Sequence, residues 1–244
     1  MTLLKMAAVT DTSDPTPTAS VRVRNEWLRR VEAEYRSAAF AQHLTLWLIQ
    51  IGAPVELVHD GLAIVVDELR HARLSFDVFT AAGGQGGPQL VQETLQLPRT
   101  SASLEHDLFV CNLNTFVVGE TVAVRLFKRL RELCAVPVAR MALDTILVDE
   151  VRHREFGWTL LDWMLSSPNG AMYRSLANQE VTAALRQRKQ LYEQSTDEPG
   201  STAMSKADRA WGLMPRSDYR HAFALCLQND YRPRFAQLGI AVAL

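Results

Sequence analysis

The sequence has little of what marks secreted, membrane or nucleic-acid-binding proteins. It contains three cysteines, Cys111, Cys134 and Cys226, whose wide separation gives neither a zinc spacing nor an even-numbered disulfide framework. No stretch approaches the ~18 uninterrupted apolar residues that predict a transmembrane helix. The formal net charge is only -1, so no basic surface for nucleic acid is expected. These absences predict a soluble cytoplasmic protein with no nucleic-acid or membrane partner.

Alternating strand patterns are also missing, which predicts an all-α fold. Apolar residues recur instead at helical spacing. The helix breakers Gly and Pro gather between such segments, notably at Gly52-Ala53-Pro54 and from Gly83 to Pro88. We therefore expect four long helices, at about 23–51, 55–80, 104–133 and 137–165.

The chain divides into three parts on these patterns. Residues 1–22 are rich in Asp, Ser, Thr and Pro and are expected to form a disordered tail. Residues 23–165 are expected to form a four-helix bundle, with a long crossover at 83–103 that makes its second and third helices parallel. Residues 166–244 are expected to pack on the bundle as shorter helices near 173–193, 206–213 and 218–228, with a loop at 195–201.

One short motif occurs twice, and it organises the rest of the interpretation. The chain reads Asp67-Glu68-Leu69-Arg70-His71 and later Asp149-Glu150-Val151-Arg152-His153. Residues i and i+3 share one face of a helix, so each Glu-x-x-His pair can bind one metal ion. A single such pair is common by chance, whereas two in the same frame indicate a two-metal site.

Two further glutamates fall at the height of these pairs. In an antiparallel helix pair, residues equidistant from the turn lie level. Glu34 lies 19 residues before a turn near residue 53, and Glu68 and His71 lie 15 and 18 after it. Glu120 lies 16 residues before a turn near 136, with Glu150 and His153 14 and 17 after it. Each hairpin therefore adds one lone Glu to one Glu-x-x-His pair.

The charge of this set calls for metal ions. Four buried carboxylates would repel one another and cost several kcal/mol each if left unpaired. Two divalent cations offset the four negative charges. Four carboxylates and two imidazoles suit two Fe ions, with Mn possible, and argue against a thiolate zinc site.

These segments, together with Glu34 to Phe40 and Gly119-Glu120-Thr121, resemble the ferritin-like di-iron carboxylate superfamily over about residues 24–165. More narrowly they resemble bacterial ferritin-like proteins of unassigned function. The resemblance implies Glu68 and Glu150 as bridges between metals, Glu34 and Glu120 as terminal ligands, and one metal for each of His71 and His153. It also implies that Asp67 and Asp149 each support a metal-bound His of the other helix.

The resemblance further implies a non-heme di-iron oxidase or oxygenase, which activates dioxygen and hydroxylates, N-oxygenates or desaturates a small organic substrate. Such an enzyme needs an electron donor, and a homodimer is compatible with it. The alternatives are a ferroxidase or iron-handling protein and a di-manganese catalase-like enzyme. His106 or a C-terminal residue could supply a seventh ligand.

Overall fold

The computed structural model describes residues 17–101, 103–193 and 204–244, and these residues are helical with no strand among them. Four long helical stretches correspond to the expected ones, and shorter helices follow. The elements are α1 (Val21–Gln50), α2 (Val55–Ala81), η1 (Gln92–Leu95), α3 (Leu104–Asn112), η2 (Leu113–Glu120), α4 (Thr121–Glu132), α5 (Pro137–Ser166), α6 (Gly170–Glu193), α7 (Lys206–Ala210), α8 (Arg216–Cys226), η3 (Leu227–Tyr231) and α9 (Arg232–Gln237). The all-α expectation is confirmed.

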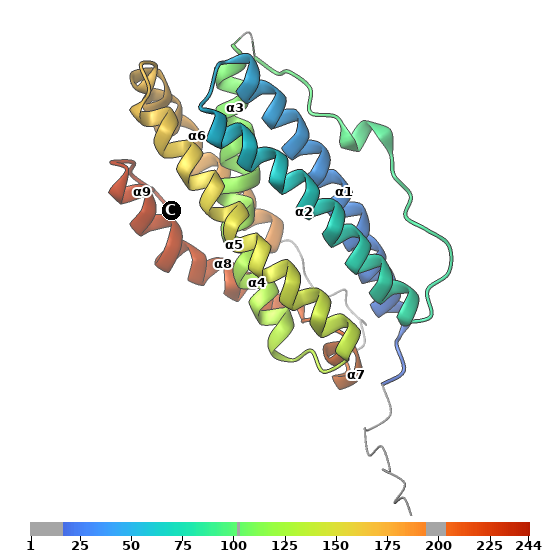
Figure 1. Cartoon of the computed structure of the whole chain (residues 1–244). Coiled ribbons are helices and arrows are strands. Elements are labelled where there is room, and N and C mark those ends of the chain that lie inside the picture. Colours follow the sequence, from blue (N-terminus) through green and yellow to red (C-terminus); the bar gives the residue numbers. More distant parts are fainter. Residues whose placement is uncertain (1–16, 102, 194–203) are drawn as a thin grey trace, which may run out of the picture.

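Two helical hairpins pack face to face (Figure 1). The first is α1 with α2, which turn at Gly52, a residue with a φ of 68° that favours glycine. The second joins the continuous stretch α3–η2–α4 to α5, whose first residue is Pro137. The faces of both hairpins that carry the predicted ligands meet where α2 contacts α5.

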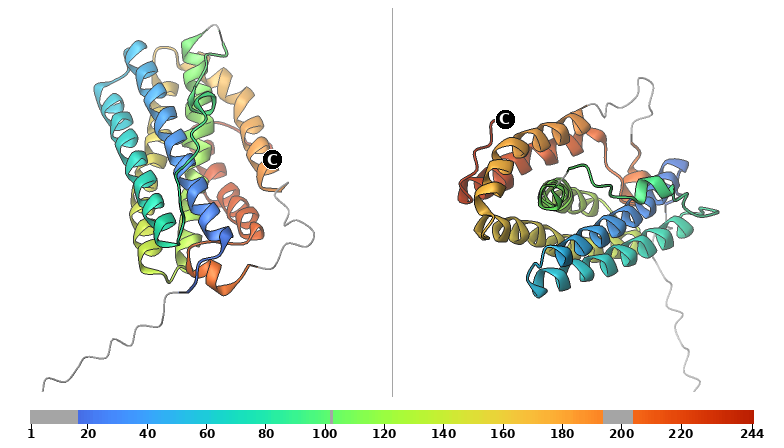
Figure 2. Two further views of the ribbon diagram at one scale, coloured as in Figure 1. Left: turned by 90° about the vertical axis from the view of Figure 1, so that its right-hand side faces the viewer. Right: turned by 90° about the horizontal axis from the view of Figure 1, so that it is seen from above.

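The crossover between α2 and α3 runs the length of the bundle along the outside of α1 (Figure 2). It contains the short helix η1, and Gln89 N donates to Glu32 Oε1 at 3.1 Å. Because the crossover returns the chain to the end where α2 began, α2 and α3–η2–α4 run in the same direction, as expected.

Two glycines allow the helices to approach closely enough to bring the facing side chains together. A Cβ on Gly157 of α5 would lie 2.6 Å from Phe116 Cβ and 2.9 Å from Val117 N. A Cβ on Gly61 of α2 would lie 2.4 Å from Thr45 Oγ1 of α1. Both contacts are shorter than packed atoms tolerate, so these positions require glycine.

The third long helix differs from the uniform helix that its spacing predicts. Its middle, η2, is a π-helix that ends at Glu120, and a second π-helix, η3, lies between α8 and α9. The two are linked, because Tyr231 of η3 donates its hydroxyl to Val118 O of η2 at 2.6 Å. Apolar periodicity does not reveal an inserted π turn, and such turns are often found at functional sites.

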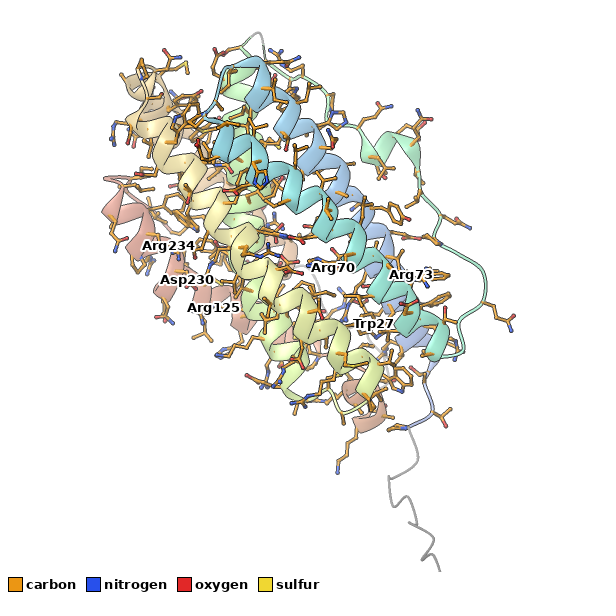
Figure 3. The ribbon with its side chains drawn as sticks, in the orientation of Figure 1. Trp27, Arg70, Arg73, Arg125, Asp230 and Arg234 are labelled. Atoms are coloured by element: carbon orange, nitrogen blue, oxygen red, sulfur yellow. The ribbon has the colours of Figure 1, made fainter. Side chains whose placement is uncertain are left out.

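The C-terminal segment packs along the second hairpin. Arg125 of α4 pairs with Asp230 at 2.5 Å, and Arg234 pairs with Glu155 of α5 at 2.7 Å (Figure 3). The expected helix at 218–228 begins at Arg216 and continues through η3 and α9 to Gln237, further than its apolar pattern indicates. The expected loop at 195–201 lies outside the described residues.

The first helix begins two residues before the end of the predicted tail. The predicted tail covers residues 1–22, of which 1–16 lie outside the described residues. The helix α1 already begins at Val21, and Ser20 caps it by accepting from Val23 N. Pro17 O accepts from Trp211 Nε1 at 2.7 Å, so contacts with the C-terminal segment hold residues that composition alone assigns to the tail.

One helix in the described part of the chain, Leu104–Glu132, is long and apolar enough by composition to cross a membrane. Its apolar window is 67% buried inside the protein, as in the core helix of a soluble protein. Polar residues interrupt the run, which is why the sequence predicts no membrane span there.

Candidate metal centre

The structure brings all six predicted ligands together in the middle of the bundle. Glu34 comes from α1, Glu68 and His71 from α2, Glu120 from the end of η2, and Glu150 and His153 from α5. Each is at most 8% exposed. Their donor atoms form two groups in which all atoms lie within 4.8 Å of one another. The first is Glu34, Glu68, His71 and Glu150, and the second is Glu120, Glu150 and His153.

Glu68 and Glu150 each lie between the two histidines. Glu68 places Oε2 3.5 Å from His71 Nδ1 and Oε1 3.2 Å from His153 Nδ1. Glu150 places Oε1 3.7 Å from His71 Nδ1 and Oε2 3.7 Å from His153 Nδ1. A carboxylate with one oxygen directed to each of two positions has the arrangement that a bridging ligand needs.

The opposite edge of each imidazole meets an aspartate of the other helix. His71 Nε2 lies 3.0 Å from Asp149 Oδ2, and His153 Nε2 lies 3.3 Å from Asp67 Oδ2. An Nε2–H that donates to a carboxylate leaves Nδ1 as the acceptor nitrogen available to a metal. The pairing of Asp67 and Asp149 with histidines across the interface therefore has the geometry that the resemblance implies.

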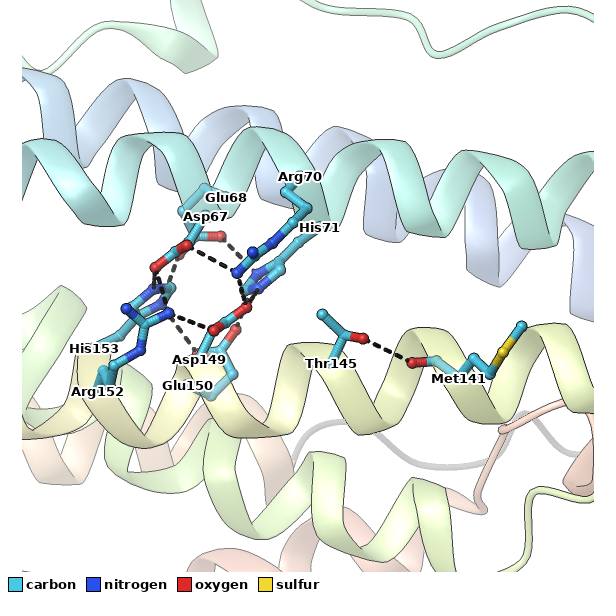
Figure 4. Close-up of polar contacts among 10 residues, drawn as sticks. All are labelled: Asp67, Glu68, Arg70, His71, Met141, Thr145, Asp149, Glu150, Arg152 and His153. Atoms are coloured by element: carbon cyan, nitrogen blue, oxygen red, sulfur yellow. Dashed lines mark hydrogen bonds and ion pairs between the residues drawn. The ribbon is translucent and has the colours of Figure 1, made fainter.

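Two arginines, Arg70 and Arg152, contact both aspartates at this interface (Figure 4). Arg70 donates to Asp67 at 2.9 Å and also to Asp149, and Arg152 donates to Asp67 at 3.0 Å and also to Asp149. The repeated Asp-Glu-x-Arg-His frame thus forms a nearly symmetric ring of two aspartates and two arginines across α2 and α5. Burial raises the pKa of Asp149, but His71, Arg152 and Arg70 outweigh it and lower the pKa.

The inner atoms of the cluster lie close to one another but form no hydrogen bond. Among buried atoms without a hydrogen bond are His71 Nδ1, His153 Nδ1, Glu68 Oε2 and Glu150 Oε2. Leaving such atoms unsatisfied costs free energy, and here the unsatisfied atoms are metal donors directed at one another. The cluster is therefore compatible with a buried metal site.

The protonation of the metal-free cluster supports the same interpretation. Burial raises the pKa of Glu34 and Glu120 far above the usual value, and the charges of the neighbouring Glu68 and Glu150 raise it further. Burial lowers the pKa of His153, but Glu150 and Glu68 outweigh it and raise the pKa to about 10. Without metal, protons compensate the excess negative charge.

A cleft of about 450 Å³ opens onto one side of this cluster. It lies between α1, η2 with α4, and α6, and Glu34, Glu120 and Glu150 reach its floor. Apolar side chains form much of its walls, and three arginines also line it. The apolar lining includes Phe40, Leu126 and Phe127, and the three arginines are Arg30, Arg36 and Arg188.

The structure gives no support for a seventh ligand from His106 or from the described C-terminal residues. Neither metal-binding group within the described residues contains His106 or a C-terminal residue. His106 precedes Glu120 by 14 residues on one continuous helical stretch, which separates them by ~20 Å. The sequence alone did not place Arg70 and Arg152 between the two aspartates, or Arg30 in the lining of the cleft. The position of Arg30 could have been inferred from its spacing, because it lies one turn before Glu34 on the same face of α1.

Comparison with models of known protein families and with curated proteins finds no match for this chain. The proposed function therefore rests on the residues of the site alone.

Proposed function

We propose that this protein is a non-heme di-iron oxidase or oxygenase built on a ferritin-like bundle. The observation that carries the proposal is the set of unpartnered donor atoms on His71, His153, Glu68 and Glu150, buried in the bundle core. Four carboxylates and two imidazoles form a donor set that suits Fe(II) or Mn(II). A cleft beside the donors, large enough for a small organic molecule, supports an oxidation of such a molecule.

In this proposal Glu68 and Glu150, which lie between the two histidines, would help to hold both metal ions. Glu34 and His71 complete the first position, and Glu120 and His153 complete the second. Two iron ions held there would supply the activation of dioxygen, and an electron donor would return them to the reduced state.

The residues of the chain hold and insulate this site. Asp149 and Asp67 accept from Nε2 of the histidines and so present Nδ1 inward. Arg70 and Arg152 neutralise both aspartates and cover the interface between α2 and α5. The π-helix η2 ends at Glu120 and sets the position of this carboxylate on the floor of the cleft.

The alternatives use the same ligands, and the cleft argues against them. Iron storage by a ferroxidase needs a shell-like oligomer, and peroxide disproportionation by a di-manganese enzyme needs no organic substrate. Apolar walls around an opening to the carboxylates have a use only when an organic molecule approaches the metals.

The proposal is tested by loading metal-free protein with Fe(II) under anaerobic conditions and then adding dioxygen. We expect rapid iron-dependent oxygen consumption in wild type, and none in Glu68→Ala. Light scattering in the same samples should show a monomer or dimer. A large closed assembly that accumulates ferric iron would favour storage, and absence of oxygen consumption by iron-loaded protein would reject the oxidase.

A further inference from the structure

Arg30 is a buried cation beside the candidate metal site, and its charge acts against the rise in the pKa of Glu34. It lies on α1 one turn before Glu34, its side chain is 8% exposed, and it lines the cleft. Its Nη2 donates to Gly212 O at 2.8 Å, and its guanidinium lies 4.2 Å from the centre of the Trp27 ring. The only carboxylate that pairs with it among the described residues is Glu26, at 3.9 Å from Nε.

The remaining nitrogen, Arg30 Nη1, has no hydrogen-bond partner. A buried guanidinium is costly unless its donors are satisfied, and the usual partner is a carboxylate or phosphate. Gly212 and Trp27 fix the position of the guanidinium, and Arg30 is one of the residues that line the cleft.

Arg188 also lines this cleft. Arg188 of α6 is half-buried, and its Nη2 donates to Asn114 O of η2 at 2.9 Å. The same lining includes the apolar side chains of Phe40, Leu126 and Phe127. Once metal ions offset the charges of Glu34, Glu120 and Glu150, the cleft combines a net positive end with apolar walls.

We propose that the cleft binds a small organic acid, whose carboxylate is recognised by the arginines Arg30 and Arg188 of the lining while its apolar body lies against the apolar walls. This inference rests on the proposed oxidase function and names its substrate class. An arginine pair suits a planar carboxylate. The apolar walls favour an organic acid over inorganic phosphate.

The test is calorimetric titration of metal-loaded protein, under anaerobic conditions, with benzoate, with its neutral isostere benzamide, and with inorganic phosphate. We expect wild type to bind benzoate at least ~10-fold more tightly than benzamide or phosphate, the ratio that one charge-assisted hydrogen bond supports. Arg30→Gln and Arg188→Gln should each reduce this preference several-fold. Arg29→Gln, an exposed arginine of α1 outside the cleft, should retain it.

Metal content of each variant separates this inference from the oxidase proposal. Equal binding of benzoate and benzamide, or tighter binding of phosphate, by protein that holds iron and consumes oxygen would overturn the inference and leave the oxidase intact. Loss of metal from Arg30→Gln would assign Arg30 to the support of Glu34 and would also overturn it. Arg188→Gln tests the same preference if Arg30→Gln does not fold.

Discussion

His71 and Asp149 lie on different helices, and His71 Nε2 approaches Asp149 Oδ2 to 3.0 Å. His153 and Asp67 repeat the relationship in the opposite direction at 3.3 Å. Each Asp-Glu-x-Arg-His frame therefore supplies the predicted ligands of its own helix and a carboxylate that lies against the histidine of the other helix. The repeat is a reciprocal arrangement, and neither helix forms half of the site alone.

Replacing Asp149 by Asn should weaken metal binding without unfolding the bundle. The amide retains the shape of the carboxylate but not its charge, so the orientation and basicity of His71 are lost. Supporting carboxylates of this kind are worth about 10–100-fold in metal affinity. Competition with a coloured chelator measures the affinity. Asp162→Asn, an exposed position on the same helix, is the matched control and should bind metal as wild type does.

Adding a methyl group at Gly157 should destabilise the protein and disturb the site. In Gly157→Ala the new Cβ meets Phe116 Cβ at 2.6 Å, so α5 and η2 must separate. Overpacking of this kind costs about 1–3 kcal/mol, and the movement displaces the π-helix that carries Glu120.

Urea unfolding followed by circular dichroism measures the decrease in the free energy of unfolding of Gly157→Ala. Gly87→Ala is the control, because a Cβ there meets nothing within 4 Å, and its stability should be unchanged or slightly higher. Equal stabilities for the two variants would contradict the close approach of α5 and η2.

Asp107 should make the stability of the protein depend on acid pH. Burial raises its pKa, but hydrogen bonds from Thr100, Arg99 and the backbone of Ser101 outweigh it and lower the pKa to about 2. A group with a lowered pKa stabilises the fold above its unfolded pKa of about 3.9, and this stabilisation disappears as the pH falls towards 2.

Asp107→Asn should therefore lose about 1–3 kcal/mol of unfolding free energy at pH 7. The difference between variant and wild type should narrow as the pH falls from about 4 to 2. Denaturant unfolding of metal-free protein across this range gives both curves. A constant difference at every pH would show that the carboxylate charge contributes nothing.

Metal binding should release protons. In the metal-free protein the pKa of His153 is raised to about 10, and the pKa of His71 is also raised, because burial is outweighed by Glu68 and Glu150. The imidazole of His153 is therefore protonated at neutral pH, and a metal must displace its proton. Apparent affinity should rise with pH through the neutral range. A pH indicator in weakly buffered solution records the release, and a titration that leaves the pH unchanged would contradict it.

The sequence predicts much of this site because its signals are local and periodic. The Glu-x-x-His spacing places Glu68 with His71 and Glu150 with His153 on single helical faces. The short turns at Gly52 and Pro137 then set the heights of Glu34 and Glu120. Helical geometry converts these spacings directly into positions, so the six side chains meet as predicted.

The π-helix and the surroundings of Arg30 depend on contacts between distant parts of the chain, which residue spacing does not reveal. The π-helix before Glu120 is stabilised by Tyr231, which lies 113 residues away from Val118. Arg30 is fixed by Gly212 O, which belongs to the C-terminal segment. Nothing in the local pattern around Tyr231 or Arg30 reveals a partner so distant, and the residues that line the cleft could not be named from the sequence for the same reason.

Metal analysis of the purified protein tests the two-metal site most directly. Metal-free wild type should take up two Fe(II) per chain in an anaerobic titration, and Glu68→Ala and His153→Ala should each bind substantially less while retaining helical content. The exposed control Asp162→Asn should still bind two. No uptake by folded wild-type protein, or undiminished uptake by both ligand variants, would contradict the account.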